Sequence, residues 1–321
     1  MIQRWLYALT TGFTFVFFSE ILFWGARSLT DFLATWLLYT LIAYLALALI
    51  AHFQVNTLWS LFLVGALYGW LTEGVVVATL YEELPISIVN TALSWHGLIT
   101  VLVGWCAVRR ALLASTPRRS MLLGAGIGLF WGAWIPFWAF LQEPGIPPAT
   151  LARLALWVAL GVPALALSYW LQNRLTPSSF APHRLEFGLL AGLFALQFLA
   201  GIAPTHPVAL LVMPLLLLLA IWGLRRHRRQ ASTRPDFLVQ LAGPIPLDNL
   251  LGLLLMAPAA MLGFLLVQFL PLTPFFHYAV YLTTTLAGAA LFALSLAKLG
   301  WPGQDHRPSP SPGLPGPADL A

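Results

Sequence analysis

Ten stretches of about 20 apolar residues follow one another along this chain, and short polar segments separate them. A helix of roughly 20 residues spans the ~30 Å hydrocarbon core of a bilayer. The apolar residues run continuously instead of alternating with polar ones, which argues against membrane strands. The pattern therefore predicts an all-α, polytopic transmembrane bundle of about ten spans, at residues 6–24, 32–51, 58–80, 86–108, 121–141, 151–171, 185–203, 208–224, 250–270 and 278–297.

Two segments fall outside the predicted spans. Residues 236–249 are apolar but contain Gly243, Pro244 and Pro246, so we expect them to lie along the membrane interface or to re-enter it. Residues 302–321 are rich in Pro, Gly and Ser, a composition typical of disorder. The sequence thus predicts one transmembrane domain over residues 1–301 and a disordered cytoplasmic tail over 302–321.

The basic residues predict the orientation of the bundle. Only Arg27 and Arg153 fall on the side opposite the N-terminus, and the other fourteen of the sixteen Lys and Arg fall on the N-terminal side. Cytoplasmic loops carry the excess of Lys and Arg. We therefore expect a multi-pass protein of the plasma (inner) membrane with both termini in the cytoplasm. Adding or removing one span midway would spoil this asymmetry, so the span count and the orientation support each other.

Composition excludes several other classes of protein. Sixty per cent of the residues are hydrophobic and only 8% are charged, whereas soluble domains carry about 25% charged residues. The net charge of +5 comes from basic residues in short loops, so it indicates topology and contact with anionic lipid and not a nucleic-acid partner. The single cysteine, Cys106, excludes an intrachain disulfide and a cysteine metal cluster. We expect no metal and no cofactor.

Glu73 is the main candidate for a functional residue, because an ionisable group inside a membrane span is costly and usually functional. It stands eight residues before Tyr81, which places it about 12 Å inside the outer end of its span. Gly65, Gly69 and Glu73 recur every four residues and form one ridge of the helix. Small residues on such a ridge allow another helix to approach closely, so Glu73 is expected to face the bundle.

The partner of Glu73 is expected in the next span. Pairing the two helices about the turn at residues 82–85 places Glu73 level with Ser94, with His96 about half a turn deeper. Asn90 and Ser94 lie on one face of an ideal α-helix and His96 on another. Glu73 is therefore expected to meet Ser94 or His96 but not both. His96 also fits a neutral histidine that bonds to a neighbouring helix.

Further acids collect near the outer end of the first four spans. Glu82 and Glu83 stand in the turn, and Glu20 lies near the outer end of the first span. A cation or protonatable solute that enters from outside would meet these acids first. Glu82 and Glu83 also fit a solvated turn, and Glu20 also fits an interfacial anchor. The candidate binding or coupling site consists of Glu20, Glu73, Glu82, Glu83, Asn90, Ser94 and His96.

No motif in the sequence fixes a reaction or a substrate. One buried acid on a glycine ridge, opposite a polar span, favours a secondary transporter or ion- or proton-coupled permease for a small solute over an enzyme. In the first alternative, an intramembrane enzyme acts on a lipid or lipid-linked substrate at the outer face, with Glu73 and His96 as a general acid-base pair. In the second, the chain is a non-catalytic subunit of a membrane complex. The partners expected are the lipid bilayer, a small solute or ion, and further subunits of a homo- or hetero-oligomer.

Overall fold

A computed structural model describes residues 1–25, 28–137, 150–175, 180–230, 234–269 and 273–300. The regular secondary structure of this part of the chain is helical, and it contains no strand. The predicted tail over 302–321 lies outside the described residues. The elements, in chain order, are α1 (Ile2–Val16), η1 (Phe17–Ile21), α2 (Leu29–Phe53), α3 (Leu58–Leu71), η2 (Thr72–Val76), η3 (Thr79–Tyr81), η4 (Ile86–Ile88), η5 (Asn90–Ala107), α4 (Val108–Leu112), α5 (Arg118–Trp134), η6 (Ile135–Phe137), α7 (Leu151–Arg174), α8 (Arg184–Gln197), η8 (Phe198–Ile202), α9 (Ala209–Arg229), α10 (Phe237–Gln240), α11 (Leu247–Leu253), α12 (Met256–Phe269) and α13 (Thr273–Gly300).

The predicted helical membrane bundle is confirmed in its class. Eight helices of the described part are long and apolar enough to cross a membrane. The first and fifth predicted spans are also helical, over Ile2–Ile21 and Arg118–Trp134, but the total of ten and the orientation stay predictions. The predicted end of the third span, at residue 80, is wrong by about one helical turn. Its helix ends at Val76, because Ala78 takes a left-handed conformation with φ of 67° that breaks a right-handed helix.

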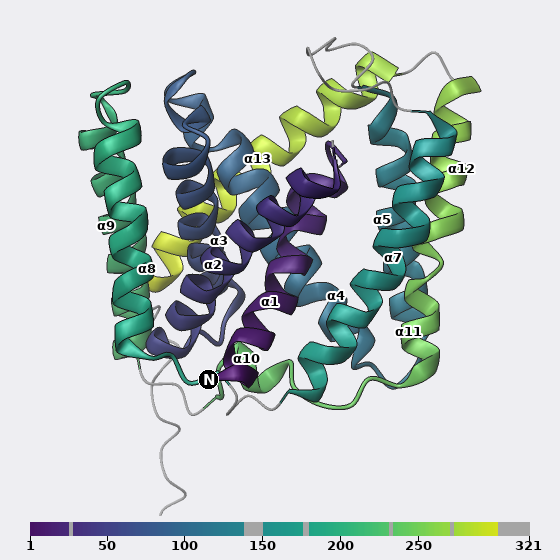
Figure 1. The fold of residues 1–321 in the computed structure, drawn as a ribbon, viewed down its shortest axis with the longest axis horizontal. Coiled ribbons are helices and arrows are strands. Elements are labelled where there is room, and N and C mark those ends of the chain that lie inside the picture. The colour runs from purple at the N-terminus through teal and green to yellow at the C-terminus, as the bar shows by residue number, and fades with distance from the viewer. Residues whose placement is uncertain (26–27, 138–149, 176–179, 231–233, 270–272, 301–321) are drawn as a thin grey trace, which may run out of the picture.

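The helices form two groups on either side of α1 (Figure 1). One group contains α5, α7, α11 and α12, and the other contains α2, α3, α8 and α9, while α13 runs obliquely behind. The N-terminus marks one end of the bundle, which we call the N-terminal end, and the end of η1 and the start of α7 lie at the opposite end. Each group has its own apolar core.

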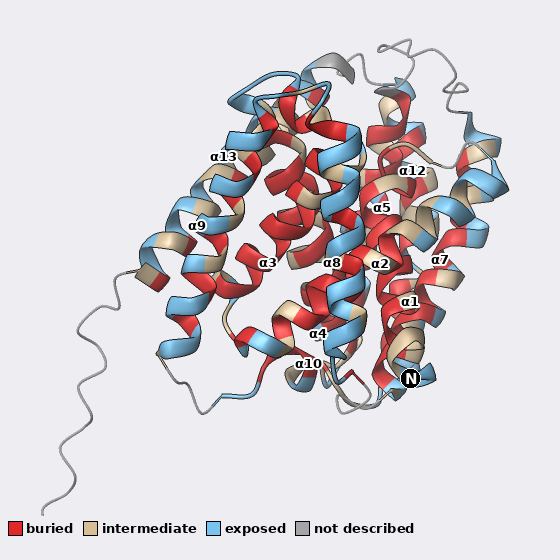
Figure 2. Ribbon diagram, turned by 60° about the vertical axis from the view of Figure 1, so that its left-hand side comes forward, coloured by how far each residue is buried: buried red, intermediate tan, exposed pale blue. Residues whose placement is uncertain are grey.

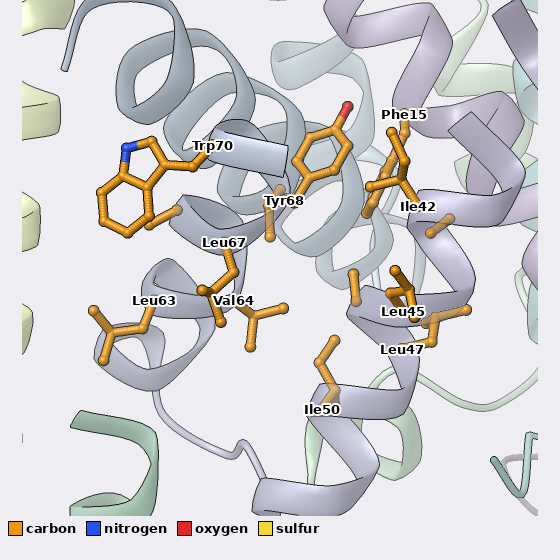
Figure 3. Packing of buried hydrophobic residues seen from close by; sticks show 14 of the residues in the cluster. Phe15, Ile42, Leu45, Leu47, Ile50, Leu63, Val64, Leu67, Tyr68 and Trp70 are labelled. Atoms are coloured by element: carbon orange, nitrogen blue, oxygen red, sulfur yellow. The ribbon is translucent and has the colours of Figure 1, made fainter. Parts of the chain in front are cut away.

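The surface of the bundle is apolar at positions where a water-soluble protein would have polar side chains. Figure 2 shows that α3 is buried along its length, while α8 is exposed along one side. The exposed positions of α8 include Leu189, Leu193 and Leu196. In lipid such a face has no need of a polar covering. Residues of α1, α2 and α3 share one apolar core. Figure 3 shows Tyr68 of α3 near Phe15 of α1, with Trp70 directed away from α2.

The segment over residues 236–249 folds onto the N-terminal end of the bundle. The short helix α10 buries Phe237 and Leu238, and the backbone N–H of Phe237 donates to the carbonyl of Val55. Gly243 follows with a φ of +134°, a conformation that glycine adopts without a steric penalty. This segment also supplies carbonyl groups to the buried side chains of Arg109 and Asn173.

Candidate functional site

Close packing between α3 and η5 brings the candidate residues together. A Cβ atom added to Gly69 would lie 2.1 Å from the carbonyl oxygen of Ala92, and one added to Gly65 would lie 3.0 Å from Cα of Gly97. The two helices can approach this closely because both glycines lack a side chain. The glycine ridge thus faces η5, and Glu73, one step further along the ridge, is only 8% exposed.

Three π-helical segments carry the polar side chains at this contact. Ser19 and Glu20 belong to η1, Glu73 belongs to η2, and His96 and Thr100 belong to η5. A π-helix bonds each N–H to the carbonyl five residues earlier, and such segments are rare and frequently occur at functional sites. Their coincidence on three neighbouring elements makes this region the main candidate site among the described residues.

His96 lies at the centre of the hydrogen-bond network. Its Nε2 is 2.7 Å from Oε1 of Glu73, and its Nδ1 is 2.9 Å from Oγ of Ser19. The hydroxyl of Ser19 is also 2.8 Å from those of Tyr68 and Thr100. His96 is 3% exposed, and both of its ring nitrogens have partners inside the protein.

The other oxygen of Glu73 and the nearby Glu20 have hydroxyl partners. Thr79 donates its hydroxyl to Oε2 of Glu73, and Tyr39 donates to Oε1 of Glu20 at 2.5 Å. The turn that carries Thr79 is held by Tyr81, whose hydroxyl donates to the carbonyl of Gly74 at 3.0 Å. Burial raises the pKa of Tyr81 to about 12, so this phenol keeps its donor proton at neutral pH.

A cavity of about 570 Å³ opens beside this network at the end of the bundle opposite the N-terminus. Its polar wall contains both glutamates of the network, His96 and Ser19, together with Asp31 and Arg153 nearer the helix ends. Its aromatic wall contains Trp24, Tyr39 and Trp95. Among the described residues, no three His, Cys, Asp or Glu side chains lie close enough to hold a metal ion.

The structure selects His96 over Ser94 as the partner of Glu73. Ser94 donates to the carbonyl of Val89 and lies against Gly288 of α13. Asn90 also faces α13, where it bonds to Tyr281 and Thr285. These two predicted residues therefore lie away from the cavity. The π-helical geometry of η5 places residues five apart on one face, which explains why Thr91 and His96 both line the cavity.

The acids of the turn do not join the site. Glu82 and Glu83 are exposed, and neither lines the cavity. Glu20 does line it. Several residues of the network and the cavity wall were absent from the sequence-based set, among them Ser19, Tyr39, Tyr68 and Arg153. Ser19 stands next to Glu20, which was the one available signal. The two tyrosines belong to apolar stretches, where a phenol is indistinguishable from packing.

The length and apolarity of its helices make this chain an integral membrane protein. A scan against protein-family models and searches of curated proteins and of solved structures match nothing to it.

Proposed function

We propose that the chain is a secondary transporter that exchanges a small organic cation for a proton. The observation that carries this proposal is the buried Glu73–His96 pair, at 2.7 Å, in the wall of the 570 Å³ cavity. Small-molecule sites have volumes of about 300–1,000 Å³. An ionisable pair this deep in a membrane helix is costly and is typical of proton and ion pathways.

The charge of the cavity supports a cation as the solute. Three carboxyl groups, those of Glu20, Asp31 and Glu73, face one guanidinium, that of Arg153. Trp24 and Trp95 add aromatic faces, which attract cations. A bound cation and a proton would compensate the same negative charge on Glu73, so binding of one favours release of the other.

Polar side chains beyond the cavity support a transport path from the cavity toward the N-terminal end of the bundle. Between α1 and α7, Gln172 donates to Thr14 and to the carbonyl of Thr10, and Ser168 donates to that same carbonyl. Oε1 of Gln172 is buried without a hydrogen-bond partner in the described part of the chain. Buried polar atoms of this kind commonly bond to internal water. With the orientation expected from the basic residues, the cavity opens outside the cell and both termini are cytoplasmic.

Proton movement in liposomes tests the exchange. The purified chain is reconstituted with a pH-sensitive dye inside, and quaternary ammonium ions of increasing size are added outside. These ions carry no dissociable proton and cross lipid poorly, so passive amine diffusion does not contribute. We expect at least one of them to make the lumen alkaline in protein-containing liposomes and not in empty ones. Failure across the whole series would refute cation–proton exchange.

A second candidate function rests on the order Ser19–His96–Glu73. A hydroxyl, an imidazole and a carboxylate joined by hydrogen bonds in this order are the catalytic groups of a nucleophilic hydrolase. The ring is reversed relative to the serine-protease arrangement, because Nδ1 faces the hydroxyl and Nε2 faces the acid. The hydroxyl of Ser19 also bonds to those of Tyr68 and Thr100, as a structural hydroxyl would. We therefore rank the hydrolase below the transporter.

A fluorophosphonate probe separates the two functions. Under the transport proposal, Ser19 is a structural hydroxyl, and we expect the detergent-purified chain to stay unlabelled. Labelling that maps to Ser19 by mass spectrometry, and that Ser19→Ala and His96→Gln both remove, would establish a reactive serine and favour hydrolysis. The measurement needs no knowledge of the substrate.

A further inference from the structure

A second pocket of about 290 Å³ lies at the N-terminal end of the bundle, far from the Glu73–His96 network. It lies between the end of α7 and the segment after α10, and its wall combines Arg174 and Asn173 with the backbone around Gly243. Trp170, Leu175 and Ile245 add apolar surface. None of the described residues that line this pocket is acidic.

A buried arginine lies directly behind the pocket. Arg109 is 0% exposed, and its Nε donates to Oδ1 of Asn173 at 3.2 Å. Its other bonds go to the hydroxyl of Tyr7 and the carbonyl of Leu241, each at 3.0 Å. All three acceptors are neutral. No carboxylate of the described residues forms an ion pair with Arg109.

A buried charge without a counter-ion is unfavourable. The effective cost of removing an ion from water is several kcal/mol, and neutral hydrogen bonds offset only part of it. Arg174 adds a second positive charge at the rim, where its guanidinium carbon lies 4.1 Å from the ring centroid of Trp170. Both charges have the same sign, so the pocket between them has a positive potential that an anion would relieve.

We propose that this pocket binds a phosphate-bearing anion. Arg174 at the rim would contact the phosphate, since guanidinium groups present paired donors that match phosphate oxygens. Arg109 acts from behind Asn173 through its charge and does not touch the ligand. The apolar residues beside Arg174 suit the glycerol and first acyl carbons of an anionic phospholipid, and free phosphate shares the same recognition chemistry. The site does not depend on the transport proposal.

Thermal unfolding of the detergent-purified full chain tests the site, because a ligand that binds only the folded state raises the melting temperature. The probes are phosphatidylglycerol, phosphatidylcholine and inorganic phosphate, each titrated separately. The test variant is Arg174→Gln. The control is Arg184→Gln, which removes the same charge from an exposed arginine outside the pocket wall.

We expect phosphatidylglycerol to stabilise the wild type and the Arg184→Gln variant equally, and to bind Arg174→Gln about tenfold more weakly, as expected for one lost charge-assisted contact. Phosphatidylcholine should have little effect. If inorganic phosphate alone produces the Arg174-dependent shift, the anion is a soluble one and the site stands. Equal weakening in both variants, equal stabilisation by both lipids, or no shift with either anion would overturn the proposal.

Discussion

Glu73→Gln is expected to abolish cation-driven proton movement while the protein remains folded. Glutamine keeps the size of the side chain and can still accept from Thr79 and bond to His96, two of the partners of Glu73. It cannot exchange a proton, and it offers no negative charge to a cation. Since proton and cation are proposed to compete for this one carboxyl group, both halves of the exchange fail together. We expect the dye signal in reconstituted liposomes to fall to the level of empty liposomes.

Glu83→Gln is the matched control, because Glu83 is exposed and does not line the cavity. It should retain most of the wild-type signal. Both variants should elute as the wild type does in size-exclusion chromatography, which separates lost coupling from lost folding. If Glu73→Gln keeps pH-dependent exchange at near wild-type rates, Glu73 is not the coupling site. If Glu83→Gln alone loses it, the coupling acid is in the turn after η3.

Two features of the site were predictable from the sequence: the importance of Glu73 and the buried face of the helix that carries it. Glu73 stood out because a charge within an apolar stretch is rare, and the spacing of Gly65 and Gly69 indicated which face of its helix is buried. The choice between Ser94 and His96 was not predictable, because the helical wheel assumed α-helical spacing. The π-helical stretch of η5 turns successive side chains by a different angle, and no residue within it signals that change.

Contacts between segments that are distant in the chain were also not predictable from the sequence. Ser19 bonds to His96 across 77 residues and Tyr39 bonds to Glu20 across 19. Helix positions follow from apolar runs, but the rotation of each helix in the bundle depends on packing among several neighbours. Arg109 illustrates this, because it counted as a basic loop residue in the orientation argument and is buried in the structure.

Gly132→Val is expected to have the largest effect on stability among changes outside the site. A Cβ atom at this position would lie 1.9 Å from the carbonyl oxygen of Ala260 and 2.6 Å from the backbone nitrogen of Phe264. Backbone atoms of α12 cannot rotate away as a side chain can, so α5 and α12 must separate. Overpacking typically costs about 1–3 kcal/mol, and a clash with backbone should reach or exceed the upper end of that range.

Gly126→Val supplies the control on the same helix. A Cβ atom added to Gly126 meets nothing within 4 Å, so this variant reports only the intrinsic effect of valine in place of glycine in a helix, which is below about 1 kcal/mol. Thermal unfolding in detergent should therefore show a large drop in melting temperature, or no folded protein, for Gly132→Val and little change for Gly126→Val. Similar melting temperatures for the two variants would mean that α5 and α12 do not pack at the closeness described.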